Sequence, residues 1–182
     1  MTDGGVSWRH LWDGGLALVA GLACILVGII PIHPGADTYP MPDLLFCLLA
    51  YWVLRRPEGA SLPLVFVLGL VADLMLGRPV GLATFLLVVM TEILRGQAQA
   101  LRDVSFVFEW MLFAVLTALM LLGQMLLLWI TFSEVPSGSL IVQYGLFTVL
   151  SYPLVAVLLG TLLGIRYPVR AAYERSTYLR GG

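Results

Sequence analysis

The sequence predicts an all-α membrane protein with six transmembrane helices, some of them short. Of its 182 residues, 60% are hydrophobic and only 12% are charged, and the mean hydropathy is +0.96. A soluble domain is roughly 45–50% apolar and about 25% charged, so this composition does not suit a water-exposed surface. Six apolar segments follow one another along the chain. We expect a transmembrane domain over residues 1–166 and a basic tail over 167–182.

Three of the six segments are long enough to cross a membrane unaided. They are the first, the fifth and the sixth, at about 12–32, 106–132 and 139–165. The hydrocarbon core of a bilayer is about 30 Å thick and a helix rises about 1.5 Å per residue, so about 20 residues are needed. The first segment is too long for the apolar part of a signal peptide and lacks a small-residue cleavage site, so we expect it to stay in the protein.

The other three segments, at about 42–54, 60–76 and 79–94, are shorter and are interrupted by charges. We expect neighbouring helices to shield them from lipid, and a re-entrant hairpin is the alternative. The turns "RRPEG" (55–59) and "GRP" (77–79) join them, and proline is well tolerated in the first turn of a helix. The sequence therefore predicts three consecutive antiparallel helices.

The arginines predict the orientation of the chain. All ten basic residues are arginine. If the N-terminus is cytoplasmic and six spans alternate, only Arg78 falls on the outer side and the other nine fall inside. Cytoplasmic loops carry such an excess of positive charge, so we expect both termini in the cytoplasm. We expect the arginine-rich tail to anchor this topology, with contact to anionic membrane lipid or to a cytoplasmic partner as the alternative.

Two carboxylates and one guanidinium interrupt the apolar segments near the expected outer surface. Asp43 follows Pro42 at the start of the second helix, where its charge meets the positive end of the helix dipole. Asp73 lies about 6 Å before the turn at Gly77, and Arg78 follows that turn. A carboxylate deep in a membrane helix costs about 2.5–3.5 kcal/mol on insertion scales. We predict that Asp43, Asp73 and Arg78 form a polar cluster that joins the short helices or contacts a partner.

Each acidic residue also has a plain structural interpretation. For Asp43 this interpretation is that it simply begins its helix. For Asp73 it is an ion pair or hydrogen bond within the bundle. A proton relay or a substrate ligand is the remaining interpretation of Asp73. Glu92 and Glu109 lie near the inner ends of the fourth and fifth helices, next to arginines, and we interpret both as interfacial charges.

Small residues recur at helical spacing in the first and the last segment. They are Ala17, Gly21, Cys24 and Gly28 on one face of the first, and Gly160 and Gly164 in the sixth. Such faces let two helix backbones approach closely. They fit packing within the protein, and the alternative is docking of another membrane protein.

Motifs for catalysis, metal binding and cofactor binding are missing from the sequence. Cys24 and Cys47 lie inside apolar runs, while His10 and His33 are isolated, so no metal-ligand spacing is present. We find no paired serine and histidine, no aspartyl protease motif and no glycine-rich phosphate loop. No basic patch suggests nucleic acid. We therefore expect a protein without catalytic activity, metal, cofactor or nucleic-acid partner.

Residues 41–85 carry several short motifs in a defined order. They are Pro42-Asp43, Tyr51-Trp52, Arg55-Arg56-Pro57, Gly69-Leu70 followed by Asp73-Leu74, Gly77, and Gly81-Leu82. In this order and spacing, the stretch resembles the MreD family of bacterial rod shape-determining membrane proteins. It differs at Val80, where that family commonly has leucine or isoleucine, and it covers about a quarter of the chain.

The resemblance implies a non-enzymatic scaffold in the cytoplasmic membrane of a rod-shaped bacterium. It implies direct binding of MreC, in a wider complex with MreB, RodA and a class B penicillin-binding protein that makes lateral-wall peptidoglycan. It also implies a fold similar to the S-components of energy-coupling-factor transporters. The residues expected to shape the site or bind the partner are Pro42, Asp43, Gly69, Asp73, Gly77, Arg78 and Gly81, and the small-residue faces offer places for an MreC helix.

Two other functions compete with the scaffold. A vitamin-binding S-component would share the size, the six helices and an outer polar pocket, although this sequence offers few polar side chains for a vitamin. A proton-coupled transporter of lipids or small molecules would use Asp73 as its proton carrier.

Overall fold

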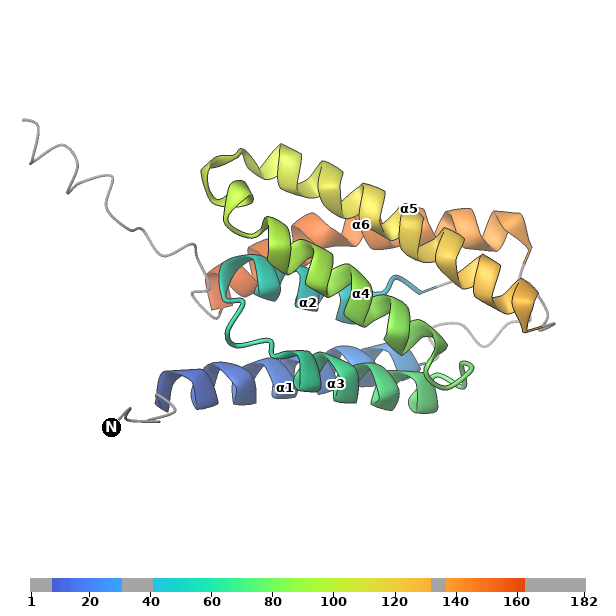
Figure 1. Cartoon of the computed structure of the whole chain (residues 1–182), viewed down its shortest axis with the longest axis horizontal. Coiled ribbons are helices and arrows are strands. Elements are labelled where there is room, and N and C mark those ends of the chain that lie inside the picture. The colour runs from blue at the N-terminus through green and yellow to red at the C-terminus, as the bar shows by residue number, and fades with distance from the viewer. Residues whose placement is uncertain (1–7, 31–40, 132–136, 163–182) are drawn as a thin grey trace, which may run out of the picture.

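The computed structural model describes residues 8–30, 41–131 and 137–162, and over these ranges the regular structure is helical (Figure 1). The helices are α1 (Trp8–Ile29), α2 (Leu44–Arg55), α3 (Leu62–Met75), α4 (Leu82–Gln97), the short 3₁₀ helix η1 (Ala100–Asp103), α5 (Phe106–Ile130) and α6 (Gly138–Leu162). The prediction of six α-helices is confirmed. The expected tail at 167–182, together with Gly164 and His33, lies outside the described residues.

Three helices are long and apolar enough to cross a membrane. They are α1 over Trp12–Ile29, α5 over Phe106–Ile130 and α6 over Gly138–Leu162. At about 1.5 Å per residue, the 25 residues of α5 or α6 exceed the thickness of the hydrocarbon core. The apolar helices α2 and α3 are shorter, with 12 and 14 residues. The chain is thus a multi-pass membrane protein with three long apolar helices.

The short helix α2 lies in the centre of the bundle. In Figure 1, α1 and α3 form one side, α5 and α6 form the other, and α2 and α4 lie between them. Every residue from Leu45 to Arg55 is buried, because α1, α4 and α6 pack around α2. Phe46 also meets Phe113 of α5, with ring centroids 5.0 Å apart. The expected shielding of the short helices is therefore correct for α2.

The same expectation is wrong for the other two short helices. In α3, Phe66 and Val67 are exposed, and in α4, Phe85 and Ile93 are exposed. Each of these helices packs one face on the bundle, since α3 contacts α1 and α4, while α4 also contacts α2 and α5. The opposite faces carry large apolar side chains, as expected of helices that face lipid.

A buried ion pair joins α2 to α5. The Nη1 and Nη2 atoms of Arg55 lie 2.8 and 3.1 Å from Oε1 and Oε2 of Glu109. The Tyr152 hydroxyl also donates to Glu109 Oε1, and the Arg55 guanidinium lies 3.6 Å from the centroid of the Tyr51 ring. Glu109 is only 3% exposed and lies in the first turn of α5, so it is a buried partner of an ion pair near the end of its helix. The fold brings it to an arginine 54 residues away, which sequence spacing did not indicate.

Two more arginines lie at the same end of the bundle and hold the turn after α2. Arg56 forms an ion pair with Asp13 of α1 at 2.5 Å. Arg95 donates to the backbone oxygens of Pro57 and Ala60, and its Nε lies 3.0 Å from Glu92 Oε1. We call this the arginine end of the bundle, defined by Arg55, Arg56 and Arg95. Its cations are bound to carboxylates and carbonyls within the chain.

Candidate functional site

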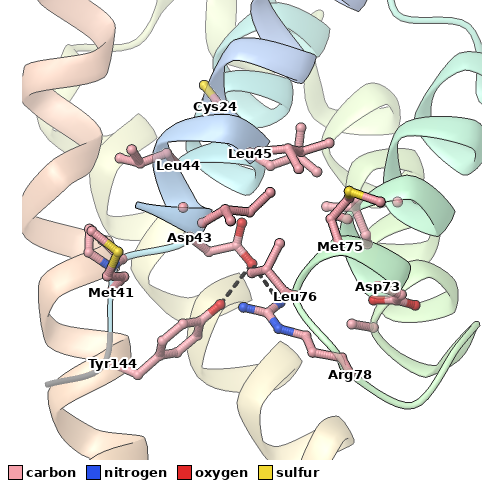
Figure 2. A pocket seen from close by; sticks show the side chains of 18 of the residues that line it. Cys24, Met41, Asp43, Leu44, Leu45, Asp73, Met75, Leu76, Arg78 and Tyr144 are labelled. Carbon is pink, nitrogen blue, oxygen red and sulfur yellow. Dashed lines mark hydrogen bonds and ion pairs between the residues drawn. The ribbon is translucent and has the colours of Figure 1, made fainter. Parts of the chain in front are cut away.

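A pocket of about 900 Å³ opens at the other end of the bundle, where α2 and α4 begin and α3 ends. Figure 2 shows it from close by. Its polar side chains include Asp43, Asp73, Thr84, Arg78 and Tyr144. Most of the remaining lining is apolar and comes from all six α-helices and the segments next to them. A pocket of this size and mixed character is typical of a binding site.

Asp43 caps α2 and also binds α6. Its Oδ1 accepts a hydrogen bond from the backbone nitrogen of Phe46 at 2.9 Å, as an N-cap carboxylate does. Its Oδ2 accepts one from the Tyr144 hydroxyl at 2.7 Å, and its backbone nitrogen donates to Thr148 Oγ1 at 3.0 Å. Both carboxylate oxygens are therefore engaged, and the start of α2 is fixed against α6.

Arg78 completes this group of polar side chains. Its Nη1 lies 3.7 Å from Asp43 Oδ2, and its guanidinium carbon lies 5.9 Å from the centroid of the Tyr144 ring. Burial acts to lower the pKa of Arg78, but the nearby Tyr144 and Asp43 oxygens outweigh it, so the pKa is raised. Arg78 therefore stays charged and offsets one carboxylate in the pocket. Figure 2 shows Asp43, Arg78 and Tyr144 pointing toward one another.

Asp73 makes a separate set of contacts, with α4. Its Oδ2 accepts hydrogen bonds from the backbone nitrogens of Gly81 and Thr84, at 2.9 and 3.2 Å, and from Thr84 Oγ1 at 2.8 Å. The carboxylate from the end of α3 thus caps the start of α4, where free N–H groups and the helix dipole favour a negative charge. The Arg78 backbone nitrogen donates a hydrogen bond to the Asp73 carbonyl, and the charge of Asp73 also acts on the Arg78 guanidinium.

The three charges that the sequence grouped together are thus arranged as two neighbouring polar groups in one pocket. Asp43 and Arg78 form the first, and Asp73 belongs to the second. The sequence analysis missed Tyr144, Thr148 and Thr84. Thr84 is the third residue of α4, but with Gly81 as the N-cap it does not form the capping-box pattern, so no local signal marked it. Tyr144 and Thr148 lie more than a hundred residues from Asp43, and no local pattern links them to it.

The predicted glycines allow the α3–α4 hairpin to form. Gly77 and Gly81 have φ angles of +65° and +89°, which only glycine adopts readily. A Cβ atom on Gly69 would lie 2.9 Å from the Thr84 Cγ2 and 3.2 Å from its Cα, so α3 and α4 are in close backbone contact there. Pro42 lines the pocket, and its carbonyl accepts a hydrogen bond from the Leu44 nitrogen at 2.9 Å.

The small-residue faces are used inside the bundle. Ala17 is buried, and a Cβ atom on Gly21 would lie 2.7 Å from the Leu68 side chain of α3. On α6, a Cβ atom on Gly160 would lie 3.1 Å from the Tyr51 hydroxyl. Gly28 has open space around it and lines the pocket. At Ala17, Gly21 and Gly160, another membrane helix would therefore have to displace part of this chain.

Within the described residues, no group of three histidine, cysteine or acidic side chains could hold a metal.

No curated protein and no solved structure matches the chain. A family model described as rod shape-determining protein MreD matches residues 14–161, from α1 to near the end of α6. Proteins of that family are generally non-catalytic membrane proteins. Because the match covers most of the chain, this protein belongs to the MreD family of rod shape-determining proteins.

Proposed function

We propose that this protein is a membrane scaffold that binds MreC directly and thereby supports lateral peptidoglycan synthesis and rod cell shape. Membership of the family supports this proposal, because its description names rod shape determination. MreB, RodA and a class B penicillin-binding protein belong to the wider complex in this proposal. Its place is the cytoplasmic membrane of a bacterium.

The proposal includes an orientation with both termini in the cytoplasm. The arginine end carries three cations, whereas Arg78 is the only arginine that the structure describes at the pocket end. Positive charge concentrates on the cytoplasmic side of membrane proteins. In this orientation the pocket opens toward the outer side.

The pocket is the proposed docking site for MreC. Five of the seven residues that the sequence singled out for structure or partner binding line it: Pro42, Asp43, Gly69, Asp73 and Arg78. The alternative faces are less suitable, because Gly21 and Gly160 are occupied by side chains of this chain. A pocket with apolar walls and a few polar groups suits a protein segment that carries both kinds of side chain.

A pull-down with a matched pair of variants tests this function. The tagged protein is extracted from its native membranes in mild detergent, and its partners are identified by mass spectrometry. Met75 and Leu74 are adjacent and similarly exposed, at 57% and 60%, but only Met75 lines the pocket. Met75→Trp should lower recovery of MreC several-fold, and Leu74→Trp should not. Absence of MreC from the wild-type eluate would contradict the scaffold function.

A second candidate is the vitamin-binding S-component. The pocket favours it, since about 900 Å³ falls within the roughly 300–1,000 Å³ of small-molecule sites. The expected S-component-like fold is likewise a proposal, supported by six helices that surround a pocket at one end. Recovery of paired ATPases and a coupling membrane subunit in the same pull-down, in place of MreC, would favour this candidate.

A further inference from the structure

The two oxygens of Asp73 have different environments. Oδ2 accepts three hydrogen bonds from Gly81 and Thr84. Oδ1 accepts none from any residue that the structure describes, although Asp73 is only 1% exposed and lines the pocket. Asp73 Oδ1 is not among the described side-chain atoms that are buried without a hydrogen-bond partner, so it reaches the surface of the pocket. The structure therefore presents an unfilled acceptor at the wall of the pocket.

No charged side chain of the described lining donates a hydrogen bond to Asp73 Oδ1. Arg78 is engaged by Asp43 and Tyr144, and Figure 2 shows its guanidinium directed toward them, with Asp73 on the other side. Asp43 uses both of its oxygens. The described side chains of the lining carry two carboxylates and one guanidinium, a formal excess of one negative charge that the N-terminus of α4 offsets in part. An incoming group that balances this charge is a cation that donates hydrogen bonds.

We propose that Asp73 Oδ1 receives a lysine or arginine side chain from the protein segment that enters the pocket, and that this contact makes Asp73 a specificity-determining residue. This inference rests on the proposed function, in which that segment belongs to MreC. A cation bound to a carboxylate forms a stronger hydrogen bond than a neutral pair, particularly away from water. Apolar lining residues such as Leu76 and Phe147 accommodate the aliphatic stem of the side chain.

A basic side chain fits the pocket better than a phospholipid headgroup. An ammonium headgroup carries a phosphate close to its cation, and that phosphate would add negative charge next to Asp43 and Asp73. The only guanidinium among the described lining residues is already bound to Asp43. A lysine or arginine brings one positive charge without an anion, which balances the excess in the pocket.

The variant Asp73→Asn tests the inference with almost no change in shape. The asparagine oxygen can still accept the bonds from Gly81 and Thr84, while its NH₂ group replaces the free acceptor with a donor. We expect affinity for purified MreC in detergent to fall at least tenfold, with little change in the unfolding temperature. Thr91→Val is the control, since it removes a buried hydroxyl of α4 that does not line the pocket, so it should bind MreC normally.

The entering group is identified by crosslinking. A photoreactive residue at Leu76, which lines the pocket, should crosslink to an MreC peptide that contains lysine or arginine. Replacing that basic residue with glutamine should lower the affinity as Asp73→Asn does, and combining the two changes should cost little more than either change alone. Unchanged affinity in Asp73→Asn, or a crosslink to lipid or to a peptide without a basic residue, would overturn the inference while the scaffold function stands. If the wild-type protein binds no MreC, the proposed function itself fails.

Discussion

The guanidinium of Arg55 and the carboxylate of Glu109 form two parallel hydrogen bonds, of 2.8 and 3.1 Å, inside the helix bundle. The two residues are 8% and 3% exposed. A hydrogen bond from Tyr152 to the same carboxylate adds α6 to the pair, so one acidic residue connects three helices. Such a pair requires both partners, because either charge alone would be buried without compensation.

We predict that Glu109→Ala lowers the free energy of unfolding by about 3–5 kcal/mol, because it leaves Arg55 buried without its carboxylate. The measurement is unfolding by heat or denaturant in detergent micelles. Asp13→Ala is the control, since the Arg56–Asp13 pair is partly exposed and should contribute at most about 1 kcal/mol. Equal losses of stability in the two variants would mean that the buried Arg55–Glu109 pair stabilises the fold no more than the partly exposed Arg56–Asp13 pair does.

The contact between Gly69 and Thr84 predicts a steric effect. Gly69→Ala places a Cβ atom 2.9 Å from Thr84 Cγ2 and 3.2 Å from its Cα, so α3 and α4 must move apart. We expect a loss of about 1–3 kcal/mol in stability, as for other overpacked sites. Gly28→Ala adds the same methyl group where no atom lies within 4 Å, and it should not destabilise the protein. Unfolding of the two variants, measured side by side, decides whether the helices are packed this closely.

Alanine substitutions at Gly81 and Gly96 should change the stability in opposite directions, because Gly81 has a positive φ and Gly96 lies in a helix. Gly81→Ala forces a side chain into the left-handed region at +89° and should cost about 1–2 kcal/mol. Gly96→Ala lies inside α4 with open space around it, and it should add about 0.5–1 kcal/mol, because alanine favours helix. Apparent melting temperatures in detergent should therefore shift in opposite directions. A shift in the same direction would contradict the geometry of the turn before α4.

The bond from the Tyr144 hydroxyl to Asp43 predicts a further loss of stability. Tyr144→Phe leaves the ring in place but removes a 2.7 Å donor to a carboxylate. Bonds to charged groups contribute about 1.5–3 kcal/mol, and we expect a loss in that range. Gln143 is the exposed neighbour in sequence, and Gln143→Ala should change stability by less than about 0.5 kcal/mol. A neutral Tyr144→Phe would show that this bond does not stabilise the start of α2, which Thr148 of α6 also contacts.

Local sequence features predicted the helices well. The expected ranges 42–54 and 60–76 agree closely with α2 and α3, because apolar runs and Pro-Gly turns define both ends. The fourth helix was placed at 79–94, whereas α4 runs from Leu82 to Gln97. Its start is displaced because Gly81 adopts a left-handed conformation. Its end is displaced because the apolar run stops at Leu94, whereas the helix continues through Arg95, which binds Glu92 and the turn after α2.

The long-range partners could not be predicted from one sequence. Asp43 and Tyr144 are 101 residues apart, and Arg55 and Glu109 are 54 apart. Periodicity assigns a residue to a face of its own helix, but it does not say which other helix covers that face. The proximity of Asp43 to Arg78 was predictable because short turns connect α2, α3 and α4. The contributions of α5 and α6 depend on how the whole bundle closes.

The central position of α2 has a consequence for how the protein is made. Its 12 residues span about 18 Å, and α4 and α6, which cover it, are synthesised after it. When α2 leaves the ribosome, α1 is the only one of its three covering helices that has been made. A chain truncated before α6 would lack both Tyr144 and Tyr152. The burial of the second helix is therefore completed only when α6, the last described helix, has been made.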